Sequence, residues 1–117
     1  MWIVSKNGFF SVVEKPGDRE RGVLTVRGRI LEDMEWFKDN ISWESEIVST
    51  PKADYGYRMQ VARQQFEQAL LAMARDVDYA NFKGNFSGEP EYEDKENRAQ
   101  IYFRVWDSLA FLEYLDD

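Results

Sequence analysis

The chain has 117 residues, 44% of them hydrophobic and 15% aromatic, which is enough for one domain with a bulky core. It contains neither cysteine nor histidine, and this excludes disulfides, thiolate nucleophiles, Ser-His-Asp mechanisms and the commonest ligand of transition metals. The formal net charge of −7 disfavours ordinary binding to nucleic acid and favours a basic protein partner.

The first part of the chain predicts an antiparallel meander of strands. Residues 2–4 and 9–13 are rich in β-formers and flank Asn7-Gly8, a dipeptide that favours a hairpin turn. A polar loop over residues 15–22 contains a Pro-Gly pair. Residues 23–27 then predict the third strand of the meander.

Three later stretches show the periodicity of helices. Residues 30–41 and 63–77 each carry one apolar stripe. Residues 97–115 carry apolar and aromatic side chains on more than one side, which predicts a heavily buried last helix. Residues 79–97 predict a long loop, and its part over 89–96 carries five acidic side chains and one basic side chain.

A further strand is predicted directly before the second helix. Residues 55–61 alternate, which places Tyr55 and Tyr57 on one face of the strand and Arg58 on the other. Residues 46–50 form a short extended piece that ends at a bend or sheet edge. We therefore expect one α+β domain over residues 1–117, a mainly antiparallel sheet of about four strands with about three helices packed on one face.

Two short motifs bracket the second predicted helix, and each places an Asp-Tyr pair a few residues before a cation. Arginine is suited to bidentate contacts with anions, so the motifs are candidate sites for a ligand or partner. Their other interpretation is structural, as turn and capping residues with packed tyrosines. The helix between them is about 22 Å long, so one shared site requires the preceding strand to run back along it. The candidate residues are Asp54, Tyr55, Tyr57, Arg58, Asp78, Tyr79, Asn81 and Lys83.

Several segments, taken in chain order, carry a resemblance. They are residues 1–13, residues 24–27, the run Thr50-Pro51-Lys52-Ala53-Asp54-Tyr55-Gly56-Tyr57-Arg58, the run Asp78-Tyr79-Ala80-Asn81-Phe82-Lys83, and Val105-Trp106 in an aromatic last helix. With these segments the chain resembles a family of small uncharacterised bacterial and phage proteins over nearly its whole length. The resemblance implies a bacterial or phage source and no activity.

The sequence contains no histidine and no cysteine, and it shows no nucleotide-binding or metal-binding motif. This favours a binding role over catalysis. Our main hypothesis is a small acidic cytoplasmic protein that binds another protein, as a phage or defence-related accessory or inhibitor. The acidic stretch over 89–96 is either a solvated charge run or a docking patch for a basic partner. A homodimer is the other association we consider. We expect no cofactor and no metal. We also expect no membrane span, because no apolar run approaches the length of about 18 residues that a span needs.

Two alternatives belong to other functional classes. The first is an enzyme, or a binder of a small anionic ligand, that uses Asp54, Arg58, Asp78 and Lys83. The second is binding of single-stranded nucleic acid on the sheet, where aromatic side chains would stack with bases. Its candidate residues are Phe9, Tyr55 and Tyr57, beside Arg19, Arg21, Arg27, Arg29, Lys52 and Arg58.

The four tryptophans divide by their place in the helical and strand patterns. Trp2 and Trp106 fall on apolar positions and are expected in the core. Trp36 and Trp43 lie off the apolar stripe of residues 30–41. An exposed pair of tryptophans at these positions would indicate an interface.

Overall fold

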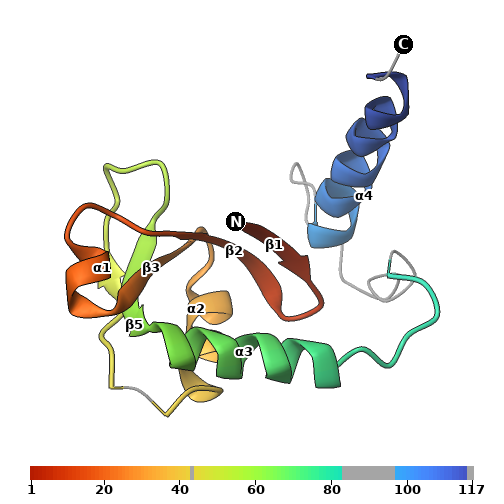
Figure 1. Ribbon diagram of the computed structural model, residues 1–117. Helices are drawn as coiled ribbons and strands as arrows, with labels where there is room; N and C mark the ends of the chain where they lie inside the picture. The colour runs from red at the N-terminus through yellow and green to blue at the C-terminus, as the bar shows by residue number, and fades with distance from the viewer. Residues whose placement is uncertain (43, 83–96, 116–117) are drawn as a thin grey trace. The chain divides into compact units, whose positions relative to one another are not determined.

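The computed structural model describes residues 1–42, 44–82 and 97–115. The chain divides into two compact units, Met1–Val77 and Asp78–Asp117. The first unit holds a five-stranded antiparallel sheet, so the expected α+β class is confirmed (Figure 1). The expectation of a single domain stays a prediction. The acidic stretch over 89–96 lies outside the described residues.

The sheet of the first unit has the strand order β1-β2-β3-β5-β4, with every neighbouring pair antiparallel. The predicted meander is confirmed, and the extended piece before Pro51 contributes the two-residue edge strand. The strands are β1 (Trp2–Ser5), β2 (Gly8–Val13), β3 (Val23–Gly28), β4 (Val48–Ser49) and β5 (Tyr57–Ala62).

The turn between β1 and β2 depends on a glycine. Gly8 has φ +144°, a conformation that side-chain-bearing residues rarely adopt. A Cβ at this position would also collide with the side chain of Asp33. The Asp33 carboxylate accepts a hydrogen bond from the Phe9 backbone N–H at 3.1 Å, so the turn is fixed to the helix that carries Asp33.

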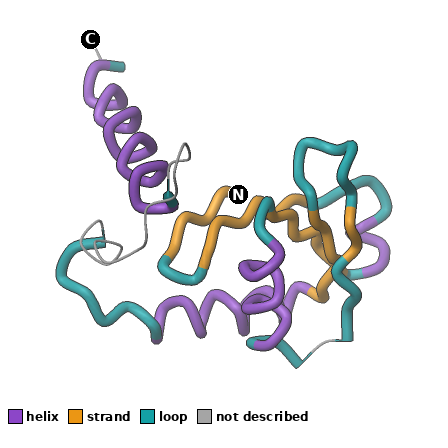
Figure 2. Tube along the Cα trace, turned by 180° about the vertical axis from the view of Figure 1, so that it is seen from behind, coloured by secondary structure: helices purple, strands orange, loops and turns teal. Residues whose placement is uncertain are grey.

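Two helices cover one face of the sheet, and their aromatic side chains join them. Helices α2 (Leu31–Asp39) and α3 (Arg63–Arg75) lie together on the same side of the strands (Figures 1 and 2). The rings of Phe37 and Phe66 stack with their centroids 6.4 Å apart. Strand residues at every second position complete this core: Phe10, Val12, Leu24, Val26, Met59 and Val61.

The opposite face of the sheet is also partly covered, by a short helix that the sequence pattern did not predict. A four-residue helix, α1 (Asp18–Arg21), lies within the predicted polar loop. Its Asp18 accepts hydrogen bonds from Thr25 and Gln60, whose strand positions alternate with the core residues. A single helical turn is too short to show periodicity, so the pattern of apolar residues could not predict α1.

The second unit contains α4 (Arg98–Leu109) and the following 3-10 turn η2 (Ala110–Tyr114). A capping box starts α4, because Asn97 and Gln100 each accept a backbone hydrogen bond from the other. Tyr102 is the buried residue of α4, and its ring stacks on Phe82 at 5.8 Å. The expectation of a heavily buried last helix stays a prediction.

Candidate functional site

The face of the sheet opposite α2 and α3 carries a group of charged and aromatic side chains around Tyr55. We call Arg27, Arg29, Asp54, Tyr55 and Arg58 the arginine–tyrosine cluster. The guanidinium carbons of Arg27 and Arg29 each lie 4.6 Å from the centroid of the Tyr55 ring. This is the geometry of a cation–π contact, which is stronger when the ring is withdrawn from water. Tyr55 is only 5% exposed, so its ring is a fixed support for two cations.

The loop before β5 holds Tyr55 in place through polar contacts. The Thr50 hydroxyl donates to the Tyr55 carbonyl at 2.7 Å, and the Asp54 carboxylate accepts from the Tyr55 N–H at 3.0 Å. The same Asp54 oxygen accepts from Arg58 at 3.0 Å, and the Asp54 carbonyl accepts from Arg29 at 2.9 Å. One turn of backbone therefore positions the aromatic ring and two of the three arginines.

Arg27 has an incompletely satisfied side chain. It donates from Nη2 to the Ser11 hydroxyl at 2.6 Å, whereas its buried Nε has no hydrogen-bond partner. It also lies directly opposite Arg58 in the β3–β5 register. Like charges at directly opposite positions of a sheet repel. The cluster thus combines three arginines with the single carboxylate of Asp54, and an incoming anion would relieve the repulsion.

A row of aromatic side chains continues from the cluster toward the edge strand β1. The Phe9 ring stacks on Tyr55 at 6.5 Å with an interplanar angle of 28°. Trp2 meets Phe9 edge-on at 6.1 Å and is 76% exposed. The expectation that Trp2 is a core residue was wrong. The alternation of side chains along an edge strand shows which face of the sheet a residue lies on, but not whether other residues pack over that face.

The burial of Trp36 and Trp106 also differs from the sequence prediction. Trp36 is partly buried against the core, where its ring lies 6.3 Å from that of Phe10, so it is no exposed interface residue. Trp106, expected in the core, is 51% exposed. Trp43 lies outside the described residues.

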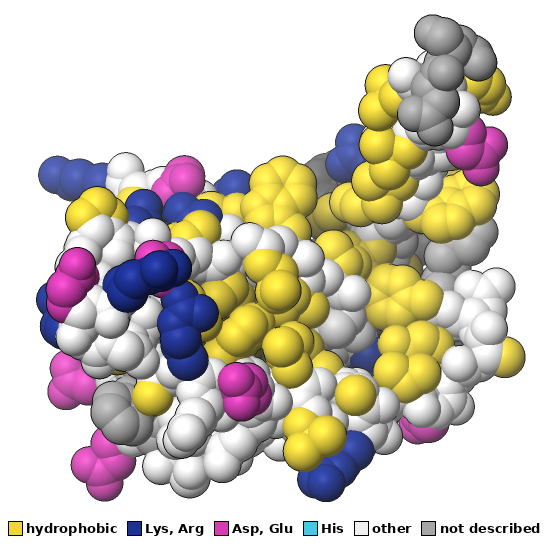
Figure 3. Space-filling view, viewed as in Figure 1, with side chains coloured by type: hydrophobic (Ala, Val, Ile, Leu, Met, Phe, Trp, Pro, Cys, Tyr) yellow, Lys and Arg dark blue, Asp and Glu magenta, His cyan; other side chains and the backbone are white. Residues whose placement is uncertain are grey.

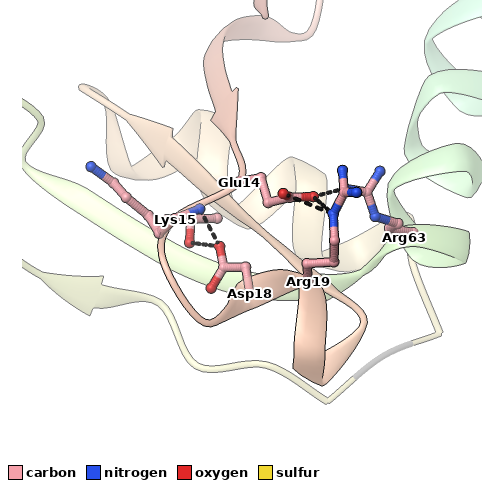
Figure 4. A network of polar contacts seen from close by, with 6 residues as sticks. Glu14, Lys15, Asp18, Arg19 and Arg63 are labelled. Atoms are coloured by element: carbon pink, nitrogen blue, oxygen red, sulfur yellow. Dashed lines mark hydrogen bonds and ion pairs between the residues drawn. The ribbon is translucent and has the colours of Figure 1, made fainter.

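The buried carboxylate of Asp18 anchors α1 beside the cluster. It accepts hydrogen bonds from the Lys15 backbone N–H and the Thr25 hydroxyl, both at 2.8 Å, and from Arg21 at 2.9 Å (Figure 4 shows the Lys15 contact). Burial raises the pKa of this carboxyl, but these hydrogen bonds and the Arg21 charge outweigh burial, so the pKa of Asp18 is lowered.

A second set of ion pairs closes the same end of the sheet. Glu14 accepts from Arg19 at 3.1 Å and also pairs with Arg63 at the start of α3 (Figure 4). These contacts connect the end of β2 with α1 and α3. Exposed pairs of this kind contribute little to stability, about 0–1 kcal/mol each.

An open cleft of about 730 Å³ lies beside the cluster and shares Arg58 with it. Both signs of charge line this cleft, so it is a polar groove with no strong preference for one ion. Its charged lining residues are Lys15, Asp18, Arg21, Glu44, Glu46 and Arg58. Across the described ranges, acidic side chains form no group of three or more that could hold a metal ion.

The sequence-predicted site residues fall into three groups. The structure brings Asp54, Tyr55 and Arg58 together on one face. Tyr57 packs against the core instead, because the strand begins at Tyr57 and strand alternation does not reach back through the turn to Tyr55.

The second predicted motif belongs to the other unit. Tyr79 contacts Phe82 at 5.7 Å, Asp78 and Asn81 have contacts of their own, and Lys83 lies outside the described residues. Phe82 stacks within the second unit on Tyr102. A site or an enzymatic function shared by both motifs stays a prediction.

The sequence pattern gave no role to Asp18, and it placed Phe9, Arg27 and Arg29 near Tyr55 only as part of a wider basic and aromatic group on the sheet. The missing information was the pairing of β3 with β5, which sets Arg27 opposite Arg58. Once that antiparallel register is known, strand alternation alone places both arginines on the face opposite the core.

No protein-family model, curated protein or solved structure matches this chain. Of the helices that the structure describes, none is both long enough and apolar enough to cross a lipid bilayer. The bacterial or phage source and the cytoplasmic location stay predictions.

Proposed function

We propose that this protein is a protein-binding module and that the arginine–tyrosine cluster, with Trp2 beside it, contacts an acidic segment of the partner. The observation that carries the proposal is the placement of two guanidinium groups at 4.6 Å from one buried tyrosine ring, with a single carboxylate among three arginines. Such a surface offers positive charge that is already held in place.

The composition of this surface is that of an interaction hot spot. Tryptophan, tyrosine and arginine are the residue types that contribute most to binding energy at protein interfaces. Trp2 supplies exposed apolar area, and the cluster supplies hydrogen-bond donors for carboxylates. Because Tyr55 and Asp54 already restrict the arginine side chains, little side-chain entropy remains to be lost on binding.

The acidic net charge of the whole chain argues against an acidic partner. The distribution of charge between the two units removes this objection. The first unit has 11 basic and 12 acidic residues, a net charge of −1, and the second has 4 basic and 10 acidic residues, a net charge of −6. Nearly all of the net charge of −7 therefore belongs to the second unit. The basic partner predicted from net charge is a separate proposal for residues 89–96.

Single-stranded nucleic acid is the second candidate, because Trp2 and Phe9 present aromatic surface beside the arginines. A protein partner is favoured since the cluster has only three arginines, whereas tight nucleic-acid binding commonly neutralises about 6–10 phosphates. An oligonucleotide titration at two salt concentrations separates the two candidates.

The test is a peptide array in which acidic and aromatic content vary independently, followed by calorimetric titration of the best peptide. We expect peptides that combine carboxylates with an apolar residue to bind. Arg29→Glu should weaken binding roughly tenfold because it places a negative charge beside the incoming carboxylates. Trp2→Ala should weaken it by a similar factor.

Matched controls come from exposed positions of the same unit. Arg75→Glu makes the same charge change on α3, and Leu71→Ala removes a side chain that is 51% exposed. Neither control should change the affinity. Equal losses in the controls and the cluster variants would contradict the proposal.

A further inference from the structure

We infer that the arginine–tyrosine cluster recognises a phosphorylated side chain of the partner segment in preference to a carboxylate. This specificity rests on the proposed function and adds to it the chemical class of the group that is bound. The first unit presents basic side chains beside hydrophobic ones on its surface, dark blue and yellow at the upper left of Figure 3. The charge of the cluster, its unused hydrogen-bond donors and the spacing of its arginines favour a phosphate group.

The cluster carries more positive charge than one carboxylate of a partner can neutralise. Its three arginines are balanced within the cluster by the single carboxylate of Asp54, which leaves a net charge of +2. A phosphorylated side chain carries about −1.5 to −2 at pH 7. A carboxylate carries a single negative charge, and so does each phosphate of a nucleic-acid backbone. One phosphorylated residue therefore balances a surplus that would otherwise require two acidic residues.

Most of the hydrogen-bonding capacity of the three arginines is unused within the described part of the chain. Each guanidinium group can donate several hydrogen bonds. Arg27 donates to the Ser11 hydroxyl, and its buried Nε has no partner. Arg29 and Arg58 each make one hydrogen bond, to the carbonyl and to the carboxylate of Asp54. A phosphate group placed opposite arginines forms about 1–3 charge-assisted hydrogen bonds, so the free donors match its oxygens.

The positive charges of the cluster are concentrated at one place on the sheet. Arg27 and Arg58 lie directly opposite each other in the β3–β5 register, where Cα atoms are about 4.5–5.5 Å apart. Arg27 and Arg29 contact the same Tyr55 ring. Two acids on an extended segment either point to opposite sides or lie about 7 Å apart, two positions along the segment. A single doubly charged group therefore fits this concentration of charge better than a pair of carboxylates.

The first experiment compares peptides that differ at one position. In the best acidic peptide from the array, one acid is made glutamate, phosphoserine or phosphotyrosine, and each peptide is titrated calorimetrically into the full chain. We expect at least one phosphopeptide to bind about tenfold more tightly than the glutamate peptide. If neither phosphopeptide binds more tightly, the inference is overturned, while binding of the glutamate peptide still supports the proposed function.

The same array is also synthesised with phosphoserine and phosphotyrosine in place of each acid. This tests the phosphate preference even if every unmodified acidic peptide fails to bind. In that case binding of phosphopeptides would support the inference, and a phosphopeptide array without binding would overturn it.

Arginine variants show whether the cluster is the site of the preference. Arg29→Gln and Arg58→Gln should each reduce the tenfold advantage of the phosphopeptide to about threefold or less. Arg75→Gln removes the same charge from an exposed position of α3 and should keep the advantage. Retention of the advantage in both cluster variants, or its loss in the α3 control, would place the preference elsewhere and overturn the inference. Circular dichroism checks that each variant stays folded.

A change of pH distinguishes a doubly charged ligand from a singly charged one. The second pKa of a phosphorylated side chain is about 6, so lowering the pH from about 7.5 to about 5.5 removes much of its second charge. The chain has no histidine, the side chain that ordinarily titrates in this range. The advantage of the phosphopeptide over the glutamate peptide should fall about threefold in acid. An advantage that does not change with pH would contradict recognition of the doubly charged group.

Discussion

At the scale of single residues, Asp18 and Arg27 differ in how far the fold satisfies their polar atoms. Asp18 is fully buried, and the donors around it include a backbone N–H, a hydroxyl and an arginine. Arg27 keeps a buried Nε without a hydrogen-bond partner. The donors around Asp18 make it a structural anchor, whereas the guanidinium group of Arg27 is only partly satisfied within the chain.

The anchoring role of Asp18 predicts a loss of stability in Asp18→Asn. One oxygen of Asp18 accepts from Lys15 and Thr25 and the other accepts from Arg21 and Gln60. An asparagine keeps a single acceptor oxygen, so one of these two pairs of donors loses its acceptor, at a cost of roughly 1–3 kcal/mol for each donor. Urea denaturation at neutral pH should show the loss. Glu20→Gln, an exposed acid on the same helix, is the matched control and should have the wild-type midpoint.

The difference in stability between wild type and Asp18→Asn should also depend on pH. The pKa of Asp18 is lowered from 3.8 in the folded state, so its contribution to stability is complete above that value and is lost as the pH falls through the folded pKa. The stability gap between wild type and Asp18→Asn should therefore narrow in acid below pH 3.8. A gap that widens in acid would show that the fold does not stabilise the carboxylate.

At the scale of elements, the hairpin turn gives the clearest stability prediction. Gly8→Ala should lower the free energy of unfolding by roughly 1–3 kcal/mol, because φ +144° strains an alanine and its Cβ meets Asp33. Gly56→Ala is the control, since no atom lies within 4 Å of a Cβ built there. Thermal or urea unfolding measures both, and an equal effect of the two changes would contradict this account of the turn.

The elements also show what a sequence can and cannot predict. The three-strand meander and the helices α2 and α3 follow from local periodicity and turn chemistry, so their prediction was confirmed. The position of Tyr55 depends on where β5 begins, and the neighbours of Arg27 depend on a pairing between distant strands. The exposure of α4 depends on what covers it. These properties are non-local, and residue patterns do not encode them directly.

At the scale of the whole molecule, the two units carry different surfaces and different charge. The first is almost neutral and presents arginines with aromatic side chains, while the second is strongly acidic by sequence and presents an apolar helix. Salt should therefore weaken the proposed peptide contact, because screening acts on exposed charges.

The most direct test of the central claim is an NMR titration of the ¹⁵N-labelled chain with the best acidic peptide from the array. The indole N–H of Trp2 and the Nε–H of Arg27 report on the arginine–tyrosine face, and the indole N–H of Trp106 reports on α4. We predict saturable shifts of the Trp2 and Arg27 signals with the Trp106 signal unchanged. Saturable binding that shifts Trp106 and leaves Trp2 and Arg27 in place would contradict the claim.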